Sequence, residues 1–81
     1  MGNLSRYRKK IDDIDRKVVG LLKIRFEIVN KISKFKIGND LTVNDRKREL
    51  EVLANIKKYS KPHKRFLVGI FKKIISHSKK L

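Results

Sequence analysis

The 81-residue chain contains no cysteine, no tryptophan and a single proline. Without cysteine, disulfide bridges and thiolate metal sites are excluded. The two histidines, His63 and His77, would lie about 20 Å apart on one helix, which argues against a shared metal. No stretch approaches the roughly 20 apolar residues that a membrane span requires. These absences favour one small domain that binds no metal.

Acidic residues are scarce: the chain has 8 Asp and Glu against 23 Lys and Arg, for a formal net charge of +15. This excess predicts an anionic partner: a nucleic acid, a membrane surface or a small acidic ligand. The alternative is that the lysines form a solvated surface with no specific function. The first ten residues, MGNLSRYRKK, lack the apolar core of a signal peptide. Arg6 stands where the myristoylation pattern requires Ser or Thr. We therefore expect a soluble, cytoplasmic protein.

Apolar residues recur every three or four positions, which is the period of an amphipathic helix. The first periodic segment covers residues 4–37 and is followed by Gly38 and a cluster of turn formers. Two further helices are expected over residues 45–60, with Asp45 as N-cap, and over residues 63–80, after Pro62. No strand pattern is visible. The sequence predicts an all-α fold in which residues 1–81 form a single three-helix domain.

The first predicted helix is too long for a compact chain of this size. Its 34 residues span about 50 Å, whereas an 81-residue globule is roughly 30 Å across. One end must therefore project with its apolar stripe uncovered, and such a stripe seeks a partner. A homodimer whose chains share their long helices, forming an intertwined helical bundle, is the simplest solution.

Polar residues occupy inward positions on these helices, as Arg25 does between Leu21 and Ile28. Glu49 and Ser78 lie in similar positions. A buried charge without a partner costs several kcal/mol of folding stability, so such positions need an explanation. Two structural explanations are open. Arg25 could pair with Glu49 in a salt bridge. Ser78 could simply donate a hydrogen bond to a backbone carbonyl.

A basic residue at the edge of the stripe suggests a functional alternative. Lys36 follows Arg25 by 11 residues, about three turns, so the two share a face and converge on one ligand. The structural alternative is that Lys36 caps the last carbonyls of the helix. Arg8 precedes Arg25 by 17 residues, about 25 Å along the axis and roughly 100° around it. In a dimer with antiparallel long helices, Arg8 of one chain meets Arg25 of the other.

The segments RKKIDDID, LLKIR, KISKFK, VNDRKRE and IFKKIISHS, taken with their spacing, resemble the all-helical class of chorismate mutases. The resemblance covers nearly the whole chain in order. It implies an intertwined dimer of three-helix chains that rearranges chorismate to prephenate, a step toward phenylalanine and tyrosine. It also implies a pericyclic reaction that needs no cofactor, metal or nucleophile, carried out by an isomerase.

The resemblance further implies which residues form the site. Arg25 would hold one substrate carboxylate, Arg8 of the other chain would hold another, and Lys36 would lie beside the ether oxygen. Asp45 and Glu49 would bind the hydroxyl side of the substrate. The catalytic residues would be Arg25, Lys36 and Glu49, and the wall would be completed by Arg48 and, at the far end, Ser78. The family's usual Gln or Glu four residues after Ser78 corresponds to position 82, one beyond this sequence.

Three other functions are compatible with the sequence. Isochorismate-pyruvate lyases resemble these mutases and use a similar basic pocket. A catalytically weak or regulatory relative is the second alternative. The third is a helical nucleic-acid-binding module, whose phosphate contacts would be the basic doublets Lys9–Lys10, Lys57–Lys58, Lys72–Lys73 and Lys79–Lys80. The lack of a recognisable binding motif and the small number of aromatic residues argue against nucleic acid as a partner.

Overall fold

A computed structural model describes residues 2–41 and 45–80. The chain forms three helices, α1 (Gly2–Gly38), α2 (Arg46–Tyr59) and α3 (Lys64–Ser78), and the described residues contain no strand. The predicted all-α class is thereby confirmed, and each observed helix end lies within two residues of the expected one. No helix in this described part is long and apolar enough to cross a membrane. That the 81 residues fold as one domain stays a prediction.

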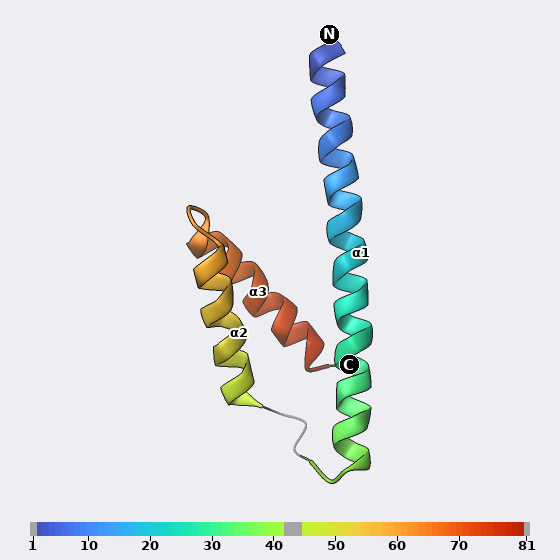
Figure 1. Ribbon diagram of the computed structural model, residues 1–81, viewed down its shortest axis with the longest axis vertical. Helices are drawn as coiled ribbons and strands as arrows, with labels where there is room; N and C mark the ends of the chain where they lie inside the picture. Colours follow the sequence, from blue (N-terminus) through green and yellow to red (C-terminus); the bar gives the residue numbers. More distant parts are fainter. Residues whose placement is uncertain (1, 42–44, 81) are drawn as a thin grey trace.

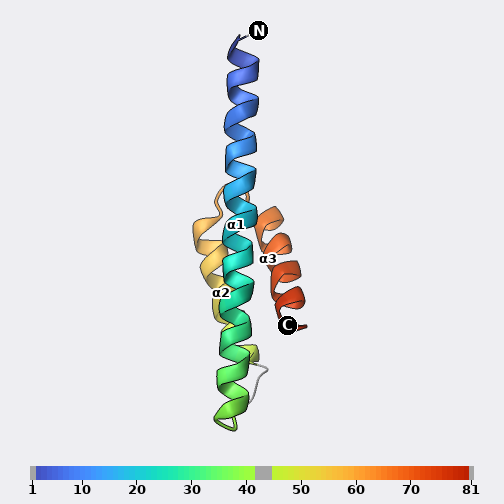
Figure 2. The same cartoon turned by 90° about the vertical axis from the view of Figure 1, so that its right-hand side faces the viewer.

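The helices are arranged as a hairpin beside a rod. Helices α2 and α3 run antiparallel next to the C-terminal half of α1, and the N-terminal half of α1 projects alone (Figures 1 and 2). The molecule measures 59 × 24 × 16 Å, with a radius of gyration of 16.4 Å. A compact chain of this length would have a radius of gyration near 12 Å. The projecting end that the length of the first helix predicts is therefore present.

Polar groups of the residues that directly follow α1 stabilise its C-terminal end. The side-chain amide of Asn39 donates to the Phe35 carbonyl at 2.9 Å, which satisfies one of the carbonyls left open at a helix end. Asp40 adopts a left-handed conformation with φ 57°, while Gly38 keeps a negative φ. Aspartate tolerates this conformation better than most residues. The expected turn continues into residues 42–44, which lie outside the described residues.

The chain on its own has almost no buried core. Among the described residues, Ile74 is the one buried apolar side chain and Ser60 the one buried polar residue. The apolar residues that recur every three or four positions along the N-terminal half of α1 remain between 48% and 67% exposed; they are Leu4, Tyr7, Ile11, Ile14, Val18 and Leu21. We call this surface the open face of α1. A chain of this size with so little buried area is not expected to be stable alone.

A second stripe of α1 packs against the hairpin. Leu22, Phe26 and Val29 are half-buried, whereas Ile28 stays 50% exposed. Arg25 lies with the half-buried residues and not within the exposed stripe where the sequence placed it. The two stripes are neighbours because each residue turns the helix by about 100°. Arg25 therefore lies on their border and turns toward α3.

One aromatic contact joins α1 to α3. The rings of Phe26 and His77 meet edge to face, with centroids 4.9 Å apart and an interplanar angle of 70°. Edge-to-face geometry places the positive edge of one ring against the negative face of the other. Since few other side chains bridge the two helices, this pair has a large share in setting how α3 lies along α1.

We expect a double-mutant cycle on Phe26→Ala and His77→Ala to yield a coupling energy of about 0.5–1.5 kcal/mol. The measurement is the free energy of unfolding of the four proteins in denaturant. The matched control is a second cycle with Phe66→Ala in place of Phe26→Ala. Phe66 is 68% exposed, so its effect and that of His77→Ala should be additive. Additive effects in the Phe26–His77 cycle would contradict the role assigned to this contact.

Candidate active site

A pocket of about 190 Å³ opens where the three helices meet. Its walls combine apolar side chains with charged and polar ones, and they are Arg25, Val29, Ile32, Ser33, Lys36, Asp45, Arg48, Glu49, Val52, Ile75, Ser78 and Lys79. Every site residue predicted from the sequence is in this set except Arg8. Residues from α1, α2 and α3 are thus brought together as the prediction requires.

Arg25 is held in place by α3. Its Nη1 donates to the Ser78 hydroxyl at 3.1 Å, and that hydroxyl donates in turn to the Ile74 carbonyl at 2.8 Å. The backbone bond expected of Ser78 is therefore present, and the same oxygen also anchors Arg25. Burial lowers the pKa of Arg25, and the positive charge of Arg48 lowers it further. The negative charge of an anion in the pocket would act in the opposite direction and raise this pKa.

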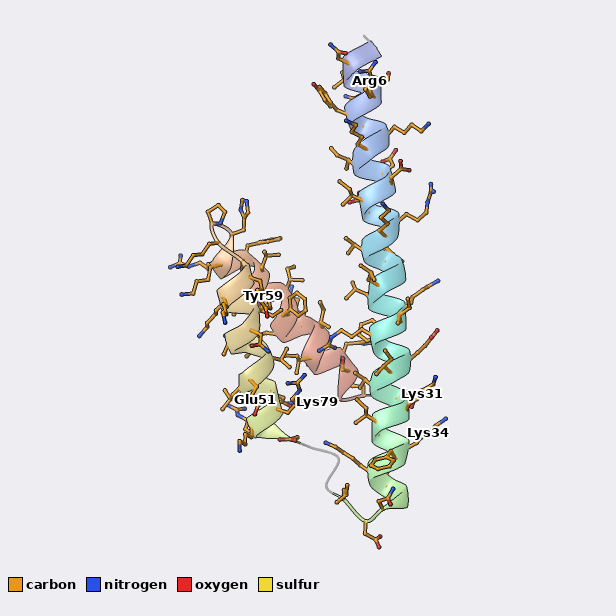
Figure 3. The ribbon with its side chains drawn as sticks, in the orientation of Figure 1. Arg6, Lys31, Lys34, Glu51, Tyr59 and Lys79 are labelled. Atoms are coloured by element: carbon orange, nitrogen blue, oxygen red, sulfur yellow. The ribbon has the colours of Figure 1, made fainter. Side chains whose placement is uncertain are left out.

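Glu49 pairs with Lys79 and not with Arg25. The distance from Lys79 Nζ to Glu49 Oε1 is 2.8 Å, and the Glu49 side chain is only 19% exposed. The proposed Arg25–Glu49 salt bridge is absent from the ion pairs of the described residues, so that interpretation is wrong. Figure 3 shows Lys79 reaching from the end of α3 toward α2. Arg25 consequently keeps its charge available for a ligand.

Lys36 and Asp45 connect the end of α1 to the start of α2. Lys36 Nζ lies 3.9 Å from Asp45 Oδ2, while Asp45 Oδ1 accepts the Arg48 backbone N–H at 3.0 Å. Asp45 is thus the N-cap that the sequence predicts. Lys36 points into the pocket, and the α1 carbonyl end is served by Asn39. Lys36 also lies in the last turn of α1, so its interpretation as a cap of the last carbonyls stays a prediction.

The pocket carries two more positive than negative charges. Its charged residues are the cations Arg25, Lys36, Arg48 and Lys79 and the carboxylates Asp45 and Glu49. Arg48 also contacts Glu51 at 3.3 Å on the exposed side of α2. The apolar walls lower the local dielectric constant and so strengthen attraction to an anion. This balance fits a small molecule with two carboxylates.

Several pocket residues were not recognised as such from the sequence. Lys79 was grouped with Lys80 as a basic doublet, although it directly follows Ser78. Val29 and Ser33 were passed over, although they follow Arg25 by four and eight residues and thus share its helix face. The described residues contain no group of three or more His, Asp or Glu side chains placed to hold a metal ion.

Arg8 does not reach this pocket. It lies on the projecting half of α1 and is exposed, and 17 residues of helix place it about 25 Å from Arg25. The structure thus brings together all predicted site residues that one chain can supply, and Arg8 stays outside.

Comparisons with known proteins identify the family of the chain. The chain is 32% identical to the chorismate mutase of Methanocaldococcus jannaschii, over 96% of its own length and 82% of that relative. It is 33% and 34% identical to bifunctional chorismate mutase/prephenate dehydratases of Buchnera aphidicola (subsp. Schizaphis graminum and Acyrthosiphon pisum), covering 94% and 89% of this chain but 20% of each relative. No solved structure matches. Residues 7–81 match the chorismate mutase type II family, and the chain belongs to this family.

Proposed function

We propose that this protein is a chorismate mutase, which converts chorismate to prephenate by an intramolecular rearrangement in the biosynthesis of phenylalanine and tyrosine. The observation that carries the proposal is that Arg25, Lys36 and Glu49, from two helices, line one and the same pocket. Its excess of two positive charges matches the two carboxylates of chorismate. Family membership and the names of the relatives support the same activity.

Each polar side chain has a role in this proposal. Arg25, already oriented by Ser78, holds one carboxylate of the substrate, because a guanidinium binds a carboxylate through two parallel hydrogen bonds. Lys36 lies beside the ether oxygen, where negative charge grows as the C–O bond breaks. Asp45 and Glu49 accept hydrogen bonds from the hydroxyl side of the substrate. Arg48, the remaining predicted contact, completes the polar wall.

The pocket accelerates the reaction by positioning and by charge. A flexible substrate reacts only from a chair-like conformer, and holding it there removes an entropic barrier. The fixed cations then stabilise the transition state more than the ground state. No side chain has to form a covalent bond, so the chemistry requires no cofactor and no nucleophile.

The complete site requires a second chain in this proposal. Arg8 is too far from Arg25 to act in the same pocket, and it lies on the half of α1 that carries the open face. Pairing two open faces antiparallel would bury their apolar residues and bring Arg8 of one chain to the pocket of the other. We therefore infer an intertwined homodimer that acts in the cytoplasm.

The proposed activity is tested by incubating the purified protein with chorismate. We expect the absorbance of chorismate to disappear and prephenate to be the product. A parallel incubation with isochorismate distinguishes the lyase alternative, because a lyase releases salicylate and pyruvate. Salicylate formation without prephenate formation would assign the same pocket to the lyase reaction.

Replacement of Arg25 separates its binding role from any structural role. We expect Arg25→Leu to reduce kcat/KM by about a hundred- to a thousandfold, since it removes a charged donor to the substrate. The free energy of unfolding should stay equal or rise, because an apolar residue replacing a half-buried charge is often neutral or stabilising. Steady-state kinetics and denaturant unfolding measure the two quantities.

The matched control is Lys34→Leu, which removes a positive charge from the same helix. Figure 3 shows Lys34 on the side of α1 away from α2 and α3, so kcat/KM should not change. Full activity of Arg25→Leu would refute the assigned role of Arg25.

Mixing two inactive variants tests whether the site is shared between chains. We expect Arg8→Ala and Arg25→Ala, unfolded and refolded together in equal amounts, to regain about a quarter of wild-type activity. Random pairing makes about half of the dimers mixed, and each mixed dimer has one site with both defects and one with neither.

Subunit exchange must be verified with mass-tagged chains, and each variant refolded alone is the control. If both arginines served one site within a chain, every site would keep a defect and mixing would restore nothing. That result would overturn the shared site while leaving the family assignment intact.

A further inference from the structure

The last third of the chain is basic without any acidic counterpart. From Val52 to Leu81 the sequence has no Asp or Glu and nine Lys and Arg residues. Among the described residues of this segment, Lys79 is the one that forms an ion pair, with Glu49. The other described cations of this segment form no ion pair and therefore create a local positive potential.

These cations gather along a groove between α2 and α3. One hollow of about 350 Å³ is lined by Lys57, Lys64, Arg65, Val68, Gly69 and Lys72. A second hollow of about 210 Å³ is lined by Arg46, Glu49, Leu50, Leu53, Lys72, Ile75, Ser76 and Lys79. Because Lys72 borders both, we treat them as one channel along the helix pair and call it the basic groove.

Gly69 keeps the first hollow open. It lies in the interior of α3, where glycine destabilises a helix relative to alanine. A Cβ atom at this position would meet nothing within 4 Å, and Gly69 does not adopt a positive φ. Neither packing within the chain nor backbone geometry requires glycine here. Its effect is to leave the groove between Arg65 and Lys72 unobstructed.

The basic groove is separate from the surface proposed for dimerisation. A two-fold interface sets a patch against its own copy. On this surface it would bring the cations of one groove, among them Lys57, Arg65 and Lys72, close to those of the other, and like charges brought together in an interface are strongly unfavourable. The open face of α1, which is apolar, has no such obstacle. The groove is thus available to a ligand of opposite charge.

We propose that the basic groove binds the phosphodiester backbone of single-stranded nucleic acid. A narrow channel lined by cations can track one backbone without reading bases. Such binding needs no base-recognition motif, so the lack of one, which argued against nucleic acid at the sequence level, does not exclude it. Tyr59 and Phe66, near the α2–α3 turn, are 75% and 68% exposed. They do not belong to the residues that line the two hollows, but exposed aromatic side chains next to such a channel can stack bases.

The proposal predicts a defined salt dependence. The first hollow is lined by four cations that form no ion pair with any described residue: Lys57, Lys64, Arg65 and Lys72. Each neutralised phosphate contributes about −0.7 to the slope of log K against log salt for single strands, so we expect a slope near −3. Affinity for a fluorescent oligouridylate, measured by anisotropy, should then fall about fiftyfold between 50 and 200 mM salt.

Variants locate the binding. We expect Lys57→Gln/Lys72→Gln to weaken oligouridylate binding by roughly ten- to thirtyfold at 0.1 M salt and to halve the slope. The matched control, Lys31→Gln/Lys34→Gln, removes the same charge from the side of α1 away from the groove (Figure 3) and should change affinity less than about twofold. Gly69→Leu fills the groove without removing charge and should also weaken binding. Turnover of chorismate should be unchanged in all three.

Several results would overturn the proposal. Equal losses in the two double variants would mean that net charge alone attracts the oligonucleotide. Displacement by chorismate would place the oligonucleotide in the active pocket. Equal affinity for duplex DNA, or binding to phosphatidylglycerol vesicles without binding to oligouridylate, would assign the groove to another partner. Apart from the competition with chorismate, these results do not depend on whether the protein is a mutase.

Discussion

Along the N-terminal half of α1, apolar side chains face outward every three or four residues, and within residues 2–41 and 45–80 nothing covers them. Burial of apolar surface is the main source of folding energy, and this chain has almost none available within itself. The elongated shape and the position of Arg8 outside the pocket are both linked to this feature. A second chain that supplied the missing burial would also supply the missing arginine.

Electrostatics then decides how the pocket is prepared. Lys79 neutralises Glu49, and Lys36 lies close to Asp45, so each carboxylate in the pocket has a cation of its own. Arg25 is oriented by a hydroxyl group instead of a carboxylate. A guanidinium that is positioned but not neutralised attracts a carboxylate more strongly than one already in an ion pair. The arrangement therefore reserves the charge of Arg25 for a ligand.

Periodicity predicts the three helices, because the alternation of apolar and polar residues reports directly on helical faces. Their ends follow from Gly38 with its turn formers, from the N-cap Asp45 and from Pro62. The spacing of 11 residues correctly places Arg25 and Lys36 on one side of α1. Sequence reasoning fails where the answer depends on tertiary packing. The pairing of Glu49 with Lys79 depends on how closely the end of α3 approaches α2, which no local pattern encodes.

The rotation of α1 was also beyond the sequence. Two adjacent apolar stripes compete for the hairpin, and periodicity does not tell which one packs within the chain. The structure turns Leu22 and Phe26 inward and leaves Ile28 exposed. Arg25 lies on the border between the two stripes, so either rotation of α1 would bring it near the hairpin. Its place in a pocket was therefore predictable, whereas the stripe that packs beside it was not.

The small number of side-chain contacts between α1 and α3, which we call the seam, has a thermodynamic consequence. Phe26 against His77 and Arg25 against Ser78 are the side-chain contacts that close it near the pocket. A ligand spanning Arg25 of α1 and Arg48 of α2 would add a link between α1 and the α2–α3 hairpin and would fill part of the space between them. Binding to the native state alone raises stability in proportion to RT ln(1 + [L]/Kd), about 2.7 kcal/mol at a hundred times Kd. For a chain with so small a core, the ligand concentration in its surroundings would thus help to set how much of the protein is folded.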